Sequence, residues 1–545
     1  MPIMMDRRAL IATGAFGIGG LLLPGGRLAA QMLSTATGFT HGVASGEPGP
    51  DSMLLWTRYL PAGGGFVKIV AEVSETPDFT KIVAGGQMET GPWRDHTVKI
   101  TVDGLKPGTS YYYRFIPPNG TASTPGRTRT LPMGRTSRFN MAIFSCSNIG
   151  FGYFNAYGHA AARDDIDLVL HMGDYIYEYA RGGYDAGGEL AKRIFPETEA
   201  IGLADYRLRY ASYRLDPDLQ ALHARFPMIC NTDDHEGAND AWEGGAQNHT
   251  PSTEGDWTLR KLAALQVWHE WMPVGDMPWK AYELGDLATY YRTDGRMMGR
   301  SRPHYLGEVM AGSPDTAAAL KAFHDGAWMD SAATIMGTEQ ENWLNHAFRT
   351  AAREKKLWQV LGTGTNLGSV YSPPDSARWI PPNAPGYVRA RVEEGVAAAK
   401  AGLPNNLDNW GGYPAARARL LKSAQSVDAN LIAVTGDSHN AWGFDLPQDG
   451  KPAGVEFGGH SVTSPGYDQI IPVADRPGVA KALVESSPEL RWMDAGNRGY
   501  MHLSLTPQAA TNEWVFMDTV KQRSAAPKPG QRMKVRPGRK VLEQA

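Results

Sequence analysis

The fold prediction starts from residues 167–179, which read DLVLHMGDYIYEY. The apolar run Leu168–Met172 is typical of a strand covered on both faces, as in the interior of an α/β sheet. Gly173 allows a close turn, and Asp174 then follows the carboxyl end of the strand, where open α/β sheets bind ligands. Tyr177 comes three residues later, and a carboxylate with a phenolate favours a hard trivalent ion such as Fe(III). Taken alone, the segment also fits a helix-start aspartate followed by packing tyrosines.

Three further apolar runs end in the same way. They are FNMAIFSC (residues 139–146), PMICNTDDHE (residues 227–236) and LIAVTGDSHN (residues 431–440). In each run, a predicted strand of mainly apolar residues is followed at its carboxyl end by cysteine, aspartate or histidine. Charged groups at buried positions are unfavourable unless they are paired or bind a metal. Together the four strand ends predict a metal site.

Length and composition set the general class. The chain has 545 residues, 42% of them apolar and 10% aromatic, so it can bury a large core and hold more than one domain. A net charge of −3 gives no indication of binding to nucleic acid or to a membrane surface. The 62 glycines and 37 prolines are spread along the chain, which indicates many tight loops.

Residues 1–30 have the features of a twin-arginine signal peptide. Arg7 and Arg8 precede a weakly apolar stretch at residues 12–23, and small residues at 28–30 suit cleavage. The apolar stretch is too short to span a membrane stably. We therefore expect the twin-arginine export machinery as a partner and a periplasmic or extracellular location. An ordinary secretory signal with two adjacent arginines is the alternative.

The chain has two cysteines, Cys146 and Cys230. In an exported protein, a disulfide is the ordinary interpretation of such a pair. Both lie in or at the end of predicted core strands, and Cys146 lies where a metal ligand is expected. We therefore favour Cys146 as a metal thiolate and Cys230 as a buried apolar side chain.

Residues 37–135 are predicted to form a small all-β domain. Residues 52–58, 67–73 and 96–102 are short strand candidates, and the last two alternate apolar with polar positions. The segment LKPGTSYYYRF, residues 105–115, resembles the turn and tyrosine-bearing strand of a fibronectin-type or Ig-like sandwich. No catalytic constellation is present here, so a structural or lid role is expected.

From residue 136 to 523 the pattern alternates strands with helices, which predicts a layered α/β domain with the sheets inside. Helices are predicted at residues 154–162, 204–224, 257–271, 337–353 and 413–424, and residues 501–505 and 513–517 are expected to pair as strands. The basic C-terminal tail, residues 524–545, is either flexible or a strap over the site, and the sequence does not distinguish the two.

Eight short motifs occur in a characteristic order along the mature chain. They are FTHGVASGEP (39–48), LWTR (55–58), FSC (144–146), GDYIYE (173–178), DPDLQ (216–220), DDHE (233–236), GDSH (436–439) and TSPG (463–466). In these motifs and their spacing the chain resembles the PhoD-like alkaline phosphatase/phosphodiesterase family, within the calcineurin-like metallophosphoesterase group. The resemblance implies a layered α/β/β/α catalytic domain that holds Fe(III) beside Ca(II).

The same resemblance implies ligand roles. By analogy with purple acid phosphatases, which share the Gly-Asp-x-x-Tyr turn, Asp174 bridges both ions and Tyr177 binds the iron. Cys146 and His439 then complete the protein ligands of the iron.

The implied calcium ligands are Asp234 and Asp437, hard carboxylates where di-zinc relatives use softer groups. In the implied mechanism the metals lower the pKa of a bound water toward about 7, and the hydroxide attacks phosphorus in line. His235 is the candidate to protonate the leaving alkoxide or stabilise the transition state. Arg296 is the candidate clamp for the substrate phosphate, with surface ion pairing as the alternative.

Two interpretations remain open for each of four further residues. Asp233 is either a ligand or a support that holds a ligand or an arginine. Asn239 and Asn366 are either calcium ligands or turn residues. His460 is either a member of the expected cleft or a packing residue.

The leading hypothesis is an exported metal-dependent phosphoesterase acting on phosphate monoesters and diesters, including phospholipids or nucleic-acid-derived diesters. No stable nucleic-acid or membrane partner is expected. The alternatives are a secreted binding module with a degenerate metal centre, a phospholipase D-like hydrolase, and hydrolysis of a non-phosphate ester. Departures from the family pattern at residues 231–232 and 362–365 lie beside the site and bear on the substrate class.

Overall fold

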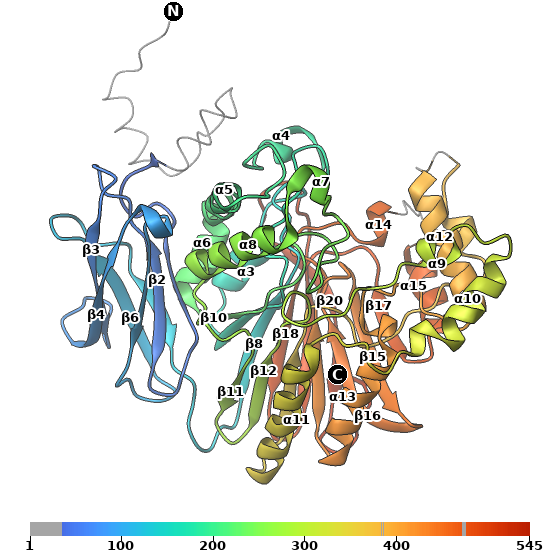
Figure 1. Ribbon diagram of the computed structural model, residues 1–545. Coiled ribbons are helices and arrows are strands. Elements are labelled where there is room, and N and C mark those ends of the chain that lie inside the picture. Colours follow the sequence, from blue (N-terminus) through green and yellow to red (C-terminus); the bar gives the residue numbers. More distant parts are fainter. Residues whose placement is uncertain (1–34, 383, 385, 471–475) are drawn as a thin grey trace, which may run out of the picture.

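The fold is built around two large β-sheets (Figure 1). The computed structural model describes residues 35–382, 384, 386–470 and 476–545, and the predicted signal peptide lies outside them. The larger sheet has ten strands in the order β21-β20-β19-β18-β8-β9-β10-β1-β2-β5. In chain order these are β1 (Val43–Gly46), β2 (Met53–Arg58), β5 (Thr97–Val102), β8 (Phe139–Phe144), β9 (Leu168–His171), β10 (Pro227–Cys230), β18 (Gly499–Leu505), β19 (Ala510–Met517), β20 (Pro527–Val535) and β21 (Glu543–Gln544).

The second sheet has seven strands in the order β11-β12-β13-β14-β16-β15-β17. Its strands β12, β13, β14 and β16 run parallel, as do β8, β9 and β10 of the larger sheet. The bounds are β11 (Lys280–Leu284), β12 (Ala288–Arg292), β13 (Trp358–Gly362), β14 (Leu431–Thr435), β15 (Ala441–Gln448), β16 (Lys451–Gly458) and β17 (Leu490–Asp494).

The two sheets pack face to face through one apolar core. Met141 and Leu170 of the larger sheet share this core with Val360 and Ile432 of the smaller one. The central strands are therefore covered on both faces, which explains their continuous apolar runs. Because the parallel strands of each sheet end at a common edge, the loops that follow them can meet there.

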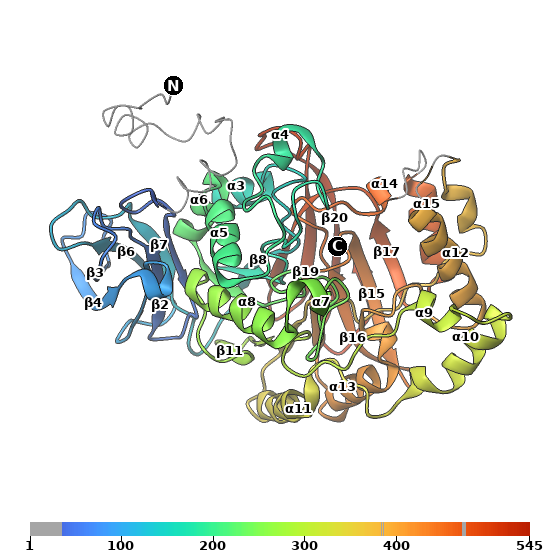
Figure 2. The same cartoon turned by 45° about the horizontal axis from the view of Figure 1, so that its top comes forward.

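Helices cover the outer faces of both sheets, as Figures 1 and 2 show. The larger sheet carries α3 (Asn155–Ala161), α5 (Leu203–Arg214), α6 (Pro217–Arg225) and α8 (Trp257–Trp271). The smaller sheet carries α11 (Gly337–Arg353), α12 (Gly386–Lys400), α13 (Pro414–Ser426) and α15 (Arg476–Ser486). The short helices are α4 (Gly188–Ala191), α7 (Pro251–Glu254), α9 (Leu306–Met310), α10 (Thr316–Asp325) and α14 (Tyr467–Ile470). The layer order is that of the predicted α/β/β/α domain.

One predicted helix, residues 204–224, is wrong as a single element. The segment forms α5 and α6, separated at Leu215 and Asp216. Pro217 cannot donate an interior helical hydrogen bond and is tolerated only in the first turn. The Asp216 carboxylate accepts hydrogen bonds from the backbone N–H groups of Asp218 and Leu219, which starts a new helix.

The N-terminal β region is joined to the larger sheet of the α/β layers. Strand β1 pairs in parallel with β10, and β2 and β5 continue the same sheet. The strands β3 (Val67–Ser74), β4 (Ile82–Thr90), β6 (Ser110–Ile116) and β7 (Gly126–Arg129) form a separate four-stranded sheet. Leu55 and Val98 pack with Ile69 and Val73 between the two layers. The fibronectin or Ig identity of this region and its boundary at residue 135 stay predictions.

The C-terminal segment is neither a free tail nor a strap over the site. Strand β20 pairs antiparallel with β19, and β21 pairs with β20. Met533 and Val535 are buried against the core between the sheets, while Arg532 and Arg536 on either side of them are exposed. The expected pairing of residues 501–505 with 513–517 is confirmed. Among the helices that the structure describes, none is both long and apolar enough to cross a membrane.

Candidate metal centre

The predicted site residues lie in loops that follow parallel strands. Cys146 follows β8, Asp174 follows β9, Asp234 and His235 follow β10, and Asp437 and His439 follow β14. The φ angles of four of these residues are positive, 58° at Cys146, 55° at Asp174 and 61° at both Asp437 and His439. Positive φ is uncommon for residues other than glycine and is concentrated at functional sites. The tight loops therefore turn these side chains toward the edge of the sheets.

Two glycines make room for Asp233 beside these loops. A Cβ atom at Gly173 would lie 2.3 Å from the Cβ of Asp233, and one at Gly364 would lie 2.1 Å from its Oδ1 atom. Gly364 belongs to the 362–365 segment that departs from the family pattern. The close approach of both backbones to Asp233 gives that departure a steric reason.

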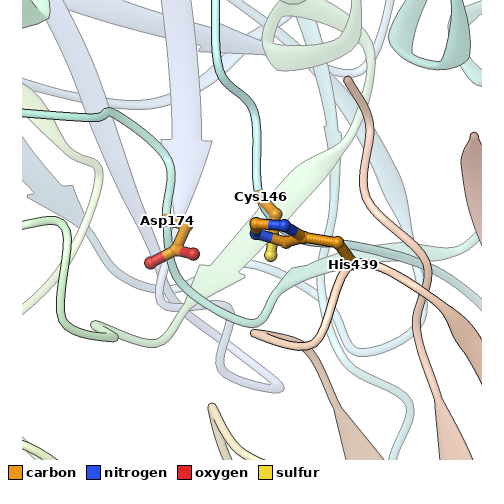
Figure 3. Close-up of side chains that lie close together, drawn as sticks. All are labelled: Cys146, Asp174 and His439. Atoms are coloured by element: carbon orange, nitrogen blue, oxygen red, sulfur yellow. The ribbon is translucent and has the colours of Figure 1, made fainter. Parts of the chain in front are cut away.

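The first group of candidate ligands consists of Cys146, Asp174 and His439 (Figure 3). One ligand atom of each lies within 4.8 Å of the others. The Tyr177 hydroxyl donates to Asp174 Oδ2 at 3.1 Å and lies 2.9 Å from His439 Nε2. Since His439 Nδ1 lies 2.8 Å from the Pro465 carbonyl oxygen, it donates there, which leaves Nε2 as the nitrogen with a lone pair facing the group.

Burial shapes the protonation of this first group. It lowers the pKa of His439 to about 3, so the imidazole is neutral, as a metal ligand must be. Burial also raises the pKa values of Cys146 and Tyr177 well above their usual ranges, and the Asp174 carboxylate raises both further. Among the described residues, no lysine or arginine forms an ion pair with Asp174, whose own pKa burial raises. A bound cation would reverse this balance and favour the charged forms.

The second group consists of Asp174, Asp234 and His235. His235 Nδ1 lies 2.7 Å from Glu178 Oε2, and Glu178 Oε1 accepts a hydrogen bond from the Asn239 backbone N–H at 2.8 Å. Burial lowers the pKa of His235, but the carboxylates of Asp234, Glu178 and Asp174 outweigh it and raise the value well above the usual one. Glu178 thus fixes the ring orientation of His235.

Glu236 ties two strand-end loops together. Its carboxylate accepts hydrogen bonds from the backbone N–H groups of Tyr175 at 2.6 Å, Asp233 at 2.7 Å and Asp174 at 3.2 Å. Neither Glu178 nor Glu236 had a role predicted from the sequence. Their places directly after the Asp174 turn and within the DDHE run were the signal available.

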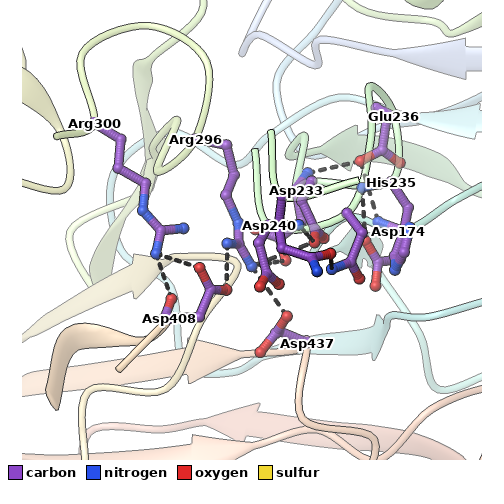
Figure 4. Close-up of polar contacts among 12 residues, drawn as sticks. Asp174, Asp233, His235, Glu236, Asp240, Arg296, Arg300, Asp408 and Asp437 are labelled. Carbon is purple, nitrogen blue, oxygen red and sulfur yellow. Dashed lines mark hydrogen bonds and ion pairs between the residues drawn. The ribbon is translucent and has the colours of Figure 1, made fainter. Parts of the chain in front are cut away.

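The third group consists of Asp233, Asp234 and Asp437, and Arg296 lies against it (Figure 4). The guanidinium donates from Nε to Asp233 Oδ1 at 2.7 Å and from Nη2 to Asp233 Oδ2 at 3.1 Å. The same Nη2 atom donates to Asp437 Oδ1 at 3.0 Å, and Nη1 donates to Asp408 Oδ2 at 2.5 Å. The alternative of a surface ion pair is wrong, since Arg296 is fully buried. The predicted phosphate clamp would require the guanidinium to leave these carboxylates.

Asp408 and Arg300 extend this network and were missed in the sequence. Arg300 Nη2 donates to Asp408 Oδ1 at 2.7 Å, so Asp408 joins the two arginines. Asp408 follows α12. This helix shares a small separate core with α9 and α10. No strand precedes Asp408, so the pattern of strand ends could not identify it.

The chemistry of the donors fits bound cations. Sulfur, phenol and imidazole donors gather on the Cys146 side, and carboxylates gather around Asp234. The buried Asp234 Oδ1 atom has no hydrogen-bond partner within the described part of the chain. Arg296 Nη2 lies 3.8 Å away, beyond hydrogen-bond distance, so this oxygen stays available to a bound cation.

Comparison with known proteins agrees with this geometry. The profile of the PhoD-like phosphatase family matches residues 141–514, and the profile of its N-terminal domain matches residues 26–132. The chain belongs to the PhoD-like phosphatase family. The family prediction is therefore confirmed, and with it the assignment to the phosphoric ester hydrolases and the presence of candidate metal-binding groups.

Individual relatives of this PhoD-like phosphatase extend the comparison. The chain is 31% identical over 523 residues to alkaline phosphatase D of Bacillus subtilis, covering 90% of this chain and 79% of that protein. The solved structure of PhoD superposes with a TM-score of 0.75 at 27% identity, over 94% of this chain and 92% of that one. A purple acid phosphatase from yellow lupin superposes with a TM-score of 0.51 at 13% identity, over 91% of this chain and 74% of that one, which shows a shared fold.

The side chains of the remaining candidates form other contacts. Asn239 directs its amide to the Gln247 side chain, and Asn366 donates to Thr435 and Glu456. His460 Nε2 lies 3.2 Å from the Val515 carbonyl oxygen. Both cysteines are buried and free, so the disulfide alternative is wrong. Cys230 packs in the core beneath the helices, as predicted.

Proposed function

We propose that this PhoD-like phosphatase is an exported alkaline phosphatase/phosphodiesterase that uses Fe(III) and Ca(II). The observation that carries the proposal is that Asp174 belongs to two adjacent groups of candidate ligands, one with Cys146 and His439 and one with Asp234. A carboxylate shared in this way suits a bridge between two cations. Export is inferred from the twin arginines at residues 7 and 8.

The two sides of the site suit different ions. Cys146, Tyr177 and His439 offer sulfur, phenol and nitrogen donors, which favours iron over calcium. The Asp234 side offers carboxylate oxygens, with Oδ2 of Asp437 as a further candidate, which suits calcium. Bound there, the two ions would supply a nucleophile from water at neutral pH and neutralise the phosphate charge.

The residues of the chain then orient the substrate and move a proton. His235 is held through Nδ1 by Glu178, which leaves Nε2 as the nitrogen that donates a proton to the departing alkoxide oxygen. The ring of Tyr177 lies 4.1 Å from that of His235, between centroids, and restricts its movement. The buried surroundings exclude bulk water and strengthen each of these interactions.

Elemental analysis with a visible absorption spectrum tests the proposal on protein purified without chelator. Iron with calcium and a charge-transfer band that disappears in Tyr177→Phe is the expected result. Zinc or manganese without the band would contradict the ligand roles but leave the phosphoesterase. Protein without metal but with full activity would contradict the two-metal centre.

A panel of esters tests the substrate class. We expect hydrolysis of phosphate monoesters and diesters, including phospholipid and nucleotide-derived diesters, and no hydrolysis of matched sulfate esters. Comparable rates on sulfate esters would favour the non-phosphate alternative. A binding module with a degenerate centre is disfavoured, because Cys146, Asp174 and His439 offer ligand atoms within 4.8 Å of one another, and Asp174 is equally close to Asp234.

A further inference from the structure

The imidazole of His235 lies beside two tyrosine rings, and one of them reaches solvent. Ring centroids are 4.1 Å apart for Tyr177 and His235, and 5.4 Å apart for Tyr179 and His235. Tyr177 is buried, and its hydroxyl lies within hydrogen-bond distance of Asp174 and His439. Tyr179 is only half-buried. Of these two rings, Tyr179 is therefore the one that a substrate can contact.

A third tyrosine packs against this ring. The centroid of the Tyr184 ring lies 5.4 Å from that of Tyr179 and 5.9 Å from that of Tyr177. Phe151 meets Tyr184 edge-on, with centroids 4.9 Å apart. These separations are those of packed aromatic pairs. Tyr184 is also half-buried, so Tyr179 and Tyr184 form an aromatic wall that leads from His235 toward solvent.

The turn that carries the aromatic wall is held by its own hydrogen bonds. The Asp185 carboxylate accepts from the backbone N–H groups of Gly182 at 2.5 Å and Gly187 at 2.8 Å. The φ angles of these glycines are 86° and 70°, a region that other residues adopt only with strain. Asn148 Nδ2 donates to the Tyr184 carbonyl oxygen at 3.1 Å. The wall is therefore formed before a substrate binds.

We propose that the aromatic wall is a leaving-group subsite that selects phosphate esters whose alcohol carries a planar aromatic ring, such as a nucleobase. The inference rests on the function proposed above, in which His235 protonates the departing alkoxide oxygen. The group attached to that oxygen extends from the His235 ring, where Tyr179 offers a face for stacking. Such stacking accepts different bases, because every base has a π-face.

The wall is expected to act on binding and not on proton transfer. A stacked base is held in the bound substrate as well as in the transition state, and uniform binding of this kind lowers KM without raising kcat. Tyr179 therefore determines specificity, while His235 keeps the chemical role.

Two monoesters that release the same alcohol test the inference. One is deoxyadenosine 5′-monophosphate, and the other is the same deoxyribose 5-phosphate with hydrogen in place of the base. In the wild type we expect KM to be about 10-fold lower for the nucleotide, with similar kcat, since stacking of one base on an aromatic ring supplies an effect of that size. Equal KM values in the wild type would overturn the inference.

Variants of Tyr179 locate the effect. In Tyr179→Leu the ratio of the two KM values should fall toward 1, and in Tyr179→Phe it should keep the wild-type value, because the ring and not the hydroxyl stacks. An unchanged ratio in a folded Tyr179→Leu protein would overturn the inference. If that variant is not recovered as a folded protein, Tyr184→Leu takes its place, with the same two outcomes.

Tyr112→Leu is the matched control. Tyr112 is also half-buried, but it lies in β6 of the separate four-stranded sheet. It should keep the wild-type ratio, and an equal fall there would overturn the specific role of the wall. Failure of the wild type to hydrolyse either ester would contradict the proposed function, and this inference with it. Hydrolysis of both esters with equal KM values contradicts this inference alone.

Discussion

The two sides of the candidate centre balance buried charge in different ways. Around Asp233, Asp437 and Asp408, two arginines neutralise the carboxylates through direct hydrogen bonds. Around Cys146, Asp174 and His439, no lysine or arginine of the described chain is paired with the donors, and burial favours their neutral forms.

The difference bears on the proposed metals. A buried anion without a counter-charge is unfavourable, so bound cations are expected on the Asp174 side. On the Arg296 side the guanidinium lowers the pKa values of Asp233 and Asp437, but burial outweighs it and raises both to about 7. Arginine pairing therefore offsets only part of the cost of burying these carboxylates.

The largest effect is expected at Asp174. Asp174→Ala removes the one residue shared by the first two groups, so metal content and activity should be lost together. Elemental analysis and a phosphatase assay on the same preparation measure both, with circular dichroism as the check on folding. An active, folded Asp174→Ala protein would end the metal interpretation of this side.

The two cysteines provide a matched pair of variants for testing the Asp174 side. Both are buried and free, but only Cys146 belongs to a group of candidate ligands. Cys146→Ser should lose most of the iron and shift the visible band, since a serine hydroxyl is a poor substitute for a thiolate. Cys230→Ser should keep both metals and lose only some thermal stability. Equal iron content in the two variants would contradict the role of Cys146.

His235 should contribute to the rate and not to metal retention. Loss of a general acid reduces a rate by about 10²- to 10⁴-fold, and His235→Asn is expected to fall in that range of kcat. The loss should be smaller for substrates with good leaving groups, such as nitrophenyl esters, because they do not need protonation. A loss independent of the leaving group would point to a structural role.

Of the four substitutions within the site, that of Glu178 should have the smallest effect on activity. It orients His235 through Nδ1 without reaching the substrate, and loss of such a partner costs about 10- to 100-fold in activity. Glu178→Gln keeps the shape and should show the same dependence on the leaving group as His235→Asn. In the double variant the two losses should not multiply, because both act through one imidazole.

Local sequence patterns predicted much of the architecture. Residues 257–271 and 337–353 form α8 and α11 with the predicted bounds, because each is a continuous helical segment with a clear start and end. The apolar runs before Cys146, Asp174, Asp234 and Asp437 form the central parallel strands. Their common direction brought the predicted side chains to one edge. The roles of those side chains as ligands stay predictions.

What the sequence by itself determined is the set of strand ends, since the burial of an apolar run and the turn after it are local properties of the chain. Only the tertiary structure decided that Asp408 meets Arg296 from 112 residues away, and that β20 and β21 extend the larger sheet beyond β19. Pairings of this kind depend on which distant surfaces pack together, and a charged residue looks the same in sequence whether its partner is water, an arginine or a metal. For that reason the sequence offered Arg296 as a clamp for phosphate or a surface ion pair, and only the packing of distant loops set it against Asp233, Asp437 and Asp408.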